Sequence, residues 1–182
     1  MTLAIARAAD ALLAGGVVTC PTEGVFGLSC MPDDDQAIAR LLSIKARDPA
    51  KGLILVAAEP AQLDGWMAAS ANDIPTPVKD QAITWIVPAA AHVSPLVRGE
   101  HKTIAVRLTT HPVMAALCDA AQSALVSTSA NRSGEPVVRN SVLLHRKFSA
   151  CVDYIVPGAC GGATGPSEIR VLATGDVLRA AE

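Results

Sequence analysis

Short apolar runs alternate with helix-forming stretches along nearly the whole chain, and this alternation is the feature that most constrains the fold. A stripe of Leu3, Ala6, Ala9 and Leu13 predicts a helix over residues 3–14. Other helices are expected near residues 33–46, 61–70, 112–122 and 141–148. Apolar runs too short for helices predict strands at residues 17–20, 53–57, 83–87, 103–108, 124–127 and 152–156, with short strands after a glycine-rich loop at 158–165. The alternation indicates an α/β fold in which helices pack on a twisted mixed sheet.

Composition fits a single domain of this kind. The chain has 182 residues, of which 51% are hydrophobic and 18% charged, so it can bury a core and is not a disordered protein. Its net charge of −2 argues against a protein that coats nucleic acid non-specifically, because such binding needs many Lys and Arg residues. A local basic pocket remains compatible with this balance.

Cysteine and histidine spacing gives no sign of a metal site held by protein ligands. The five cysteines include no Cys-x-x-Cys pair, and the four histidines are scattered. Reduced thiols of a cytoplasmic protein are the simplest interpretation. Arg7 and Asp10 interrupt what would be the apolar part of a signal peptide, and no apolar run is long enough to span a bilayer. We therefore expect a cytoplasmic protein with no membrane segment.

The segment Ser127–Gly134, Ser-Thr-Ser-Ala-Asn-Arg-Ser-Gly, is rich in hydroxyl and amide groups and follows the apolar run Ala124-Leu125-Val126. Serine and asparagine favour ordinary turns because they bond to their own backbone. A strand that leads into such a loop can instead present hydroxyl and N–H groups to a ligand at its carboxyl end, where open α/β sheets bind ligands. Taken alone, the segment leaves both interpretations open.

A group of three cations precedes the strand expected at residues 53–57. Ile38, Leu41 and Leu42 mark the buried face of a helix, and Lys45 continues that stripe one turn later. Lys45 could extend outward along the helix end or point into a cleft. Arg47 and Lys51 follow closely, and three cations repel one another unless an anion such as a triphosphate lies between them. On this reasoning, alanine at Lys45 should be tolerated for stability, since it would remove an unpaired cation.

Five ordered blocks of sequence together resemble the YrdC family. They are Pro-Thr-Glu-Gly-Val-Phe-Gly-Leu from Pro21, Lys-Ala-Arg-Asp from Lys45 with Lys-Gly-Leu-Ile-Leu from Lys51, Thr-Ile-Ala-Val-Arg from Thr103, the Ser127–Gly134 segment, and Gly-Pro-Ser-Glu-Ile-Arg from Gly165. The resemblance runs from about Val17 to Arg179. It implies a YrdC-like fold and synthesis of threonylcarbamoyl-AMP from L-threonine, bicarbonate and ATP, with release of pyrophosphate.

The resemblance also implies roles for individual residues. Lys45 and Arg47 match the Lys-x-Arg pair that handles the ATP phosphates and are the expected catalytic residues. The positions that match threonine-binding residues are Thr22, Arg107, Ser127 and Ser167. Those expected to bind ATP, besides the catalytic pair, are Lys51, Thr103, Ser129, Asn131 and Arg179.

The same resemblance implies the reaction's companions. Mg²⁺ is expected to arrive on the ATP phosphates rather than at a protein site. The product would pass to the tRNA-modifying proteins TsaD, TsaB and TsaE, and direct tRNA contact is compatible with the family. A non-catalytic module that binds double-stranded RNA or tRNA is the alternative, although the acidic net charge and the aromatic content of 3% count against it.

Three places depart from the family pattern. The segment 78–82, Val-Lys-Asp-Gln-Ala, stands where the family usually has a Trp-Pro-Gly-Pro turn, and Gly24 stands where many relatives have threonine. Arg179 is followed by Ala-Ala, without the glycine that is common after the matching arginine. None of the three departures removes a residue that is expected to bind a substrate.

Overall fold

The described residues form one large mixed sheet. The computed structural model describes residues 2–78, 81–163, 165 and 167–180, and these form a nine-stranded sheet with the order β7-β1-β2-β6-β3-β5-β4-β8-β9. Pairing is parallel between β7 and β1, β3 and β5, and β4 and β8, and antiparallel between the other neighbours. The strands are β1 (Val18–Pro21), β2 (Phe26–Cys30), β3 (Ile54–Ala57), β4 (Ile83–Pro88), β5 (Thr103–Leu108), β6 (Leu125–Ser129), β7 (Tyr154–Ile155), β8 (Glu168–Val171) and β9 (Val177–Arg179).

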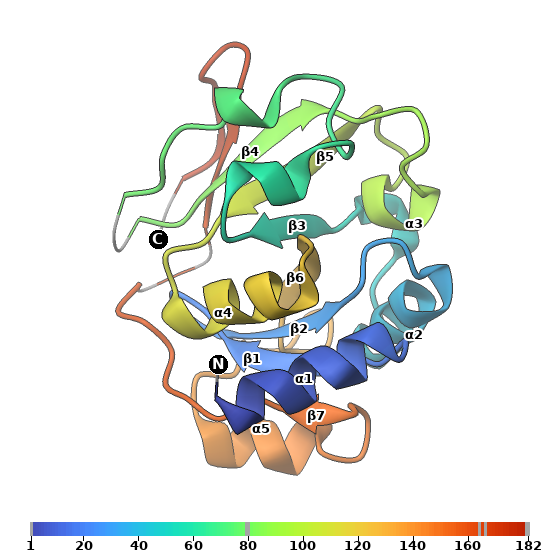
Figure 1. Ribbon diagram of the computed structural model, residues 1–182, viewed down its shortest axis with the longest axis vertical. Coiled ribbons are helices and arrows are strands. Elements are labelled where there is room, and N and C mark those ends of the chain that lie inside the picture. Colours follow the sequence, from blue (N-terminus) through green and yellow to red (C-terminus); the bar gives the residue numbers. More distant parts are fainter. Residues whose placement is uncertain (1, 79–80, 164, 166, 181–182) are drawn as a thin grey trace.

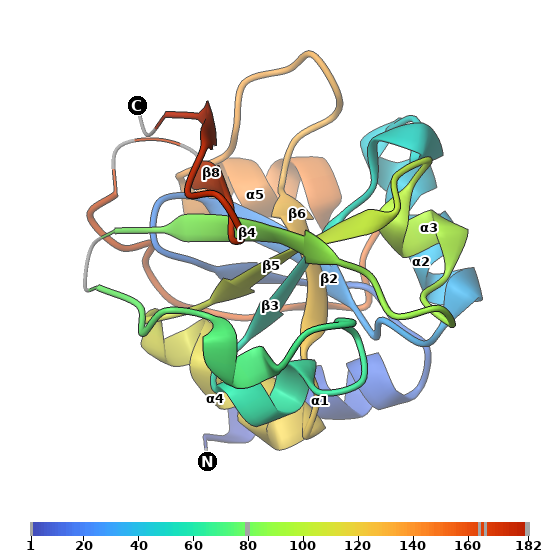
Figure 2. The same ribbon diagram turned by 90° about the horizontal axis from the view of Figure 1, so that it is seen from above.

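Helices cover both sides of this sheet (Figures 1 and 2). The helices α1 and α4 lie side by side on one side, and α5 lies on the other. The α-helices are α1 (Leu3–Leu13), α2 (Asp35–Lys45), α3 (Pro95–Arg98), α4 (Pro112–Ala121) and α5 (Ser141–Phe148), and the 3₁₀ turns are η1 (Pro49–Lys51), η2 (Pro60–Leu63) and η3 (Ala71–Asp73). The fold expected from the sequence, an α/β domain with helices on a mixed sheet, is confirmed.

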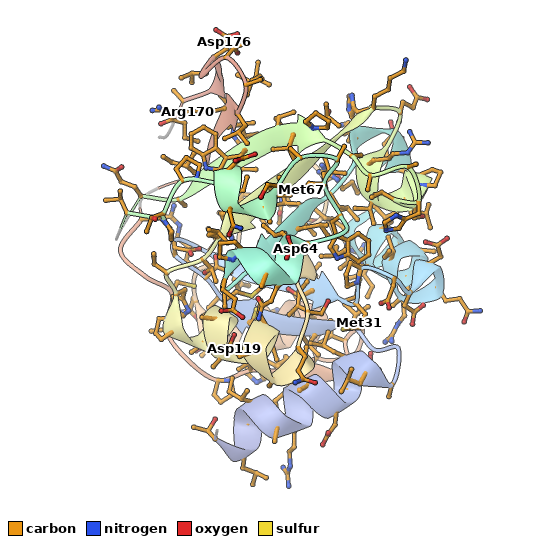
Figure 3. All side chains as sticks on the ribbon, turned by 45° about the horizontal axis from the view of Figure 1, so that its top comes forward. Met31, Asp64, Met67, Asp119, Arg170 and Asp176 are labelled. Atoms are coloured by element: carbon orange, nitrogen blue, oxygen red, sulfur yellow. The ribbon has the colours of Figure 1, made fainter. Side chains whose placement is uncertain are left out.

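Two hydrophobic clusters form because successive side chains of a strand point to opposite faces. On β3, Leu55 belongs to the larger cluster, together with residues of α2, whereas its neighbour Val56 belongs to the smaller cluster beneath α1 and α4. Figure 3 labels one methionine of each region: Met67 is buried in the larger cluster, and Met31 packs against the smaller one. The same figure places Arg170 and Asp176 at the β8–β9 end of the molecule, away from α1.

Local structure differs from the sequence-based expectation in five places. Residues 61–70 do not form the expected helix, because only η2 is helical there. Gly65, with φ +84°, turns the backbone away from a helical path, and Met67 then forms a β-bridge with Ala89. Strand β2 and the short helix α3 were not predicted. The strand expected at residues 152–156 is shorter, and β6 extends to Ser129.

No helix in the described ranges combines the length and the apolar character needed to cross a membrane.

Candidate active site

A cavity of about 160 Å³ gathers residues that are far apart in the sequence. Seven of the eleven predicted site residues line it, namely Thr22, Arg47, Arg107, Ser127, Ser129, Ser167 and Arg179. A second cavity of about 330 Å³ adjoins it and shares Arg47 and Arg179 with it. Two further predicted residues, Lys51 and Thr103, line this second cavity. The remaining two, Lys45 and Asn131, line neither of these cavities.

The floor of the first cavity is one face of β3, β5 and β6. Ile54 pairs with Ser127 on one side and with Ala105 on the other, and Val56 pairs with Arg107, so these side chains share a face. Towards one end this face is covered by α1 and α4, which bury Val56. Towards the other end it is open, and there Ile54 and Ser127 line the cavity.

The position of β6 corrects one expectation from the sequence. One of the two interpretations of the Ser127–Gly134 segment puts a ligand at the carboxyl edge of an open α/β sheet. Because β6 is antiparallel to both neighbours, Ser129 pairs with Gly27 near the start of β2, and Ser127 pairs with Ile54 at the start of β3. The cavity therefore lies over the face of the sheet rather than at a shared carboxyl edge.

Lys45 lies beneath the Ser127–Gly134 segment and holds it. Its side chain is 3% exposed, and its Nζ donates to the carbonyl oxygens of Ser129 at 2.6 Å and Asn131 at 3.1 Å. The same Nζ lies 3.2 Å from Ser129 Oγ and 2.9 Å from Asn131 Oδ1. Of the two orientations that the helical stripe left open, the structure shows the buried one, and the premise that this cation is unpaired is wrong. Burial, and secondly the charge of Arg47, lower the pKa of Lys45 to about 8.

Asn131 completes this arrangement from within the segment. Its Oδ1 accepts a hydrogen bond from Ser129 Oγ at 2.7 Å, and its Nδ2 donates to the carbonyl oxygens of Arg132 and Glu135. Asn131 is 8% exposed. In this structure its polar groups organise the loop, while Ser129 also faces the cavity.

Arg47 reaches both cavities because of the way α2 ends. Asp34 caps the start of α2 by accepting from the N–H groups of Gln36 and Ala37, and Ala46 ends it with a left-handed backbone of φ 49°. The chain then turns, and Arg47 donates from Nε and Nη2 to the carbonyl oxygen of Gly52 at 3.1 and 2.9 Å. The guanidinium is thus fixed at the junction of the two cavities.

Arg107 forms a buried pair with Glu23, a residue to which the sequence analysis gave no role. Nη2 of Arg107 lies 3.4 Å from Oε2 of Glu23. Oε1 of Glu23 accepts from Thr109 Oγ1 at 2.5 Å and from the Thr110 N–H at 3.1 Å. Burial alone would raise the pKa of Glu23, but Arg107 and these hydrogen bonds hold it below its usual value. The first cavity therefore contains the carboxylate of Glu23 beside the guanidinium group of Arg107.

Ser167 and Arg179 form another wall. Oγ of Ser167 lies 2.7 Å from Oγ1 of the buried Thr84, a second polar residue for which no role was predicted. Arg179 donates from Nε and Nη2 to the Ser167 carbonyl oxygen at 3.1 and 2.7 Å. The β8–β9 hairpin thereby brings residues from the last part of the chain to the cavity. The departure at 78–82 adjoins this wall in sequence, and its residues 79–80 lie outside the described ranges.

The turn between β1 and β2 is bonded to the loop that follows β7. Thr22 donates from Oγ1 to the Val25 carbonyl oxygen at 2.8 Å, so its hydroxyl fixes the turn. The loop's Gly161 and Ala163 donate their N–H groups to the carbonyl oxygens of Thr22 and Glu23. A Cβ at Gly24 would lie 2.9 Å from the Ala163 carbonyl oxygen, so the loop packs where a side chain would otherwise stand.

The second cavity combines an apolar floor with cationic residues. Ile54, Ile86 and Ile169 contribute apolar surface, while Lys51 and Arg98 add positive charge to that of Arg47 and Arg179. Such a site can accept a flat apolar group and an attached anion. Among the described residues, no group of three or more His, Cys, Asp or Glu side chains could hold a metal ion.

The chain is similar to known proteins over nearly its whole length. The Sua5/YciO/YrdC family, described as "Telomere recombination", matches residues 10–181. The threonylcarbamoyl-AMP synthase of Nitrosococcus oceani is 45% identical over 175 residues, covering 94% of this chain and 95% of that protein. That of Chromohalobacter salexigens is 44% identical over 183 residues, covering 96% of each.

Solved structures share the fold. A substituted Sua5 from P. abyssi superposes with a TM-score of 0.87 at 25% identity, covering 98% of this chain and 56% of that one. The E. coli YciO structure gives 0.80 at 22% identity, covering 97% and 88%. A family match over almost the whole sequence, and relatives above 40% identity along nearly their full length, establish that this chain belongs to the Sua5/YciO/YrdC family.

Proposed function

We propose that this protein is an L-threonylcarbamoyladenylate synthase, a nucleotidyltransferase that condenses L-threonine, bicarbonate and ATP into threonylcarbamoyl-AMP and pyrophosphate. The observation that carries the proposal is the identity of 44–45% to two proteins named threonylcarbamoyl-AMP synthase, over nearly the full length of both chains.

The two adjoining cavities support this function. The smaller one has hydroxyl groups and Arg107, which suit an amino acid that carries a carboxylate and a hydroxyl. The larger one has an apolar floor and cations, which suit a base with its phosphates. Arg47 and Arg179 line both, so phosphates bound there would lie next to the amino acid.

The reaction needs positioning and positive charge more than an acid–base pair. The threonine amine takes up carbon dioxide with loss of a proton, or bicarbonate with loss of water, to give a carbamate. A carbamate oxygen then attacks the α-phosphorus while pyrophosphate leaves. Cations at the junction would stabilise the negative charge that develops on the phosphates. Lys45 contributes by holding the loop that carries Ser129 beside them.

The same proposal implies a metal ion that accompanies ATP and proteins that receive the product. Mg²⁺ enters with ATP as part of the substrate, coordinated by the phosphates. The product is handed to the tRNA-modifying proteins TsaD, TsaB and TsaE, which puts the activity in the cytoplasm. Direct tRNA contact would assist the hand-over.

Pyrophosphate release tests the assignment. The full reaction with Mg²⁺, ATP, L-threonine and bicarbonate should release pyrophosphate, and omitting any one substrate should abolish release. Mass spectrometry should then detect threonylcarbamoyl-AMP. Turnover of ATP that is indifferent to threonine would contradict the synthase function, and tight RNA binding without turnover would favour a non-catalytic RNA-binding module.

A further inference from the structure

Glu23 is the only Asp or Glu among the described residues that line the first cavity. It is 6% exposed, and Oε1 is fixed by Thr109 and Thr110 at the end of β5. With its pKa held below the usual value by Arg107 and these bonds despite its burial, Glu23 carries a negative charge at neutral pH. The cavity therefore offers one anionic partner to a cationic group of a ligand.

The pair of Glu23 and Arg107 is close but incompletely bonded. Oε2 of Glu23 lies 3.4 Å from Nη2 of Arg107, yet it accepts no hydrogen bond from any described residue. Nε of Arg107 is likewise a buried donor with no acceptor among the described residues. Buried polar groups of this kind are uncommon, because leaving them unpaired costs free energy. One acceptor and one donor thus lie unpaired in the same wall.

A zwitterion would satisfy both groups. An α-amino acid carries a carboxylate for Arg107 and an ammonium group for Glu23 on the same carbon atom. A carboxylate without the amine would bring a second negative charge beside Glu23 and leave Oε2 unpaired. Arg47 and Arg179 also line the cavity, but they donate to the carbonyl oxygens of Gly52 and Ser167 at the junction with the second cavity.

We infer that Glu23 is a specificity-determining residue: together with Arg107 it makes the cavity select zwitterionic α-amino acids over carboxylates that lack the amine. This inference rests on the proposed function, because it takes L-threonine as the ligand of this cavity. It assigns to Glu23 the recognition of the amine, which no residue predicted from the sequence provides.

Calorimetry with two ligands tests the inference. L-threonine and (R)-3-hydroxybutyrate differ only in the amine, and the wild-type protein should bind L-threonine at least about tenfold more tightly. The variant Glu23→Gln keeps an oxygen that can accept from Thr109 and Thr110 but loses the charge. It should bind L-threonine about 10- to 100-fold more weakly, with 3-hydroxybutyrate affinity unchanged or higher.

The preference ratio separates specificity from a merely structural role. If Glu23→Gln weakens both ligands equally, Glu23 only supports the fold and the inference is wrong. Should this variant fail to fold, wild-type protein still decides: equal affinity for the two ligands would overturn the inference. Glu135→Gln is the matched control, because Glu135 is exposed and paired with Lys147, so both affinities should stay unchanged.

The same titrations distinguish this inference from the proposed function. Absence of L-threonine binding to wild-type protein would contradict both. Binding of L-threonine without discrimination against 3-hydroxybutyrate would contradict the inference alone.

Discussion

Lys45 is a buried cation whose partners come from the end of β6 and from the loop that follows it. The four acceptors around Nζ belong to Ser129 and Asn131, so one side chain fixes the conformation of the loop. Its helical position left burial open and did not predict these partners, because a stripe on a helix carries no information about which distant segment covers it. The expectation that alanine is tolerated there therefore has to be reversed.

Replacing Lys45 by methionine should destabilise the protein. Lys45→Met keeps the apolar stem but leaves buried carbonyl oxygens of the loop without a donor, which should lower the free energy of unfolding by about 1–3 kcal/mol. Urea denaturation measures this change. Lys51→Met is the control, since Lys51 is exposed, and it should change stability by less than about 0.5 kcal/mol. Equal stability of the two variants would show that the hydrogen bonds of Lys45 contribute nothing.

Nucleotide binding should weaken in alkaline solution. Burial and Arg47 lower the pKa of Lys45 to about 8, so its ammonium group is charged below that pH and becomes neutral above it. Loss of this charge weakens the bonds that hold Ser129 beside the first cavity. ATP affinity of the wild-type protein should therefore fall as the pH rises from 7 to 9, and the Lys45→Met variant should lack this step. A step of the same size in the variant would assign the titration to another group.

Glu23 marks the limit of residue-level prediction. Glu23 belongs to the Pro-Thr-Glu block that carries the family resemblance, but only its neighbour Thr22 is predicted to be a site residue. The pairing of Glu23 with Arg107 depends on a register that brings residue 23 to the end of β5, 84 residues further along the chain (107 − 23). The order of residues in the sequence does not show that these two side chains lie next to each other.

Among the elements, the turn before β2 and the loop after β7 fit each other because residue 24 is glycine. The loop's carbonyl oxygens at Ala163 and Gly165 lie 2.9 and 3.0 Å from where a Cβ would be. Gly24 replaces the threonine of many relatives, so one polar side chain is absent. The loop after β7 packs closely against the space that this side chain would fill.

Gly24→Ala should displace that loop and weaken threonine binding. Both contacts are with backbone atoms, which cannot rotate away, and a shift near 1 Å at a substrate site can cost on the order of 10²-fold in activity. We expect a raised KM for L-threonine with little change in the KM for ATP. Gly162→Ala, in the same loop, is the control, because its Cβ would meet nothing within 4 Å. Similar KM values for L-threonine in the Gly24→Ala and Gly162→Ala variants would contradict the close packing of the loop against residue 24.

Elements with a clear period were predicted, and those defined by tertiary contacts were not. The apolar stripes of α1 and α2 and the short apolar runs of β3 and β5 identify them. Strand β2 has Gly27 and Ser29 facing Ser129 and Ser127 of β6, so its sequence lacks the apolar run of a buried strand. Residues 61–70 contain Leu63, Trp66 and Met67 at helical spacing, but Gly65 and the pairing of Met67 with Ala89 take the chain out of helix.

At the scale of the whole molecule, Arg40 and Asp153 tie α2 to the edge of the sheet. Oδ2 of Asp153 accepts from Arg40 Nη1 at 2.5 Å and from the Val17 N–H at 2.7 Å. Arg40 Nη2 also donates to the Cys151 carbonyl oxygen. Three separate parts of the chain thus meet at one half-exposed carboxylate.

This tie should make stability depend on acid pH. Partial burial opposes ionisation of Asp153, but the hydrogen bonds from Arg40 and Val17 lower its pKa below the usual value. Its contribution is therefore present at neutral pH and is lost as the pH falls through the lowered pKa. Asp153→Asn should lower the Tm at pH 7 and reduce the loss of Tm on acidification. Asp10→Asn, at an exposed position of α1, should leave both unchanged, and identical acid profiles of wild type and Asp153→Asn would refute the role of this tie.

The strand order β2-β6-β3 has a consequence for folding during synthesis on the ribosome. Strands β2 and β3 are complete by residue 57, but the strand that joins them ends at residue 129. Until that residue has emerged, the nascent chain carries two strand edges without their native partner, and such edges pair readily with other chains. Between these two points of synthesis, the growing polypeptide therefore exposes two strand edges that can pair with other chains.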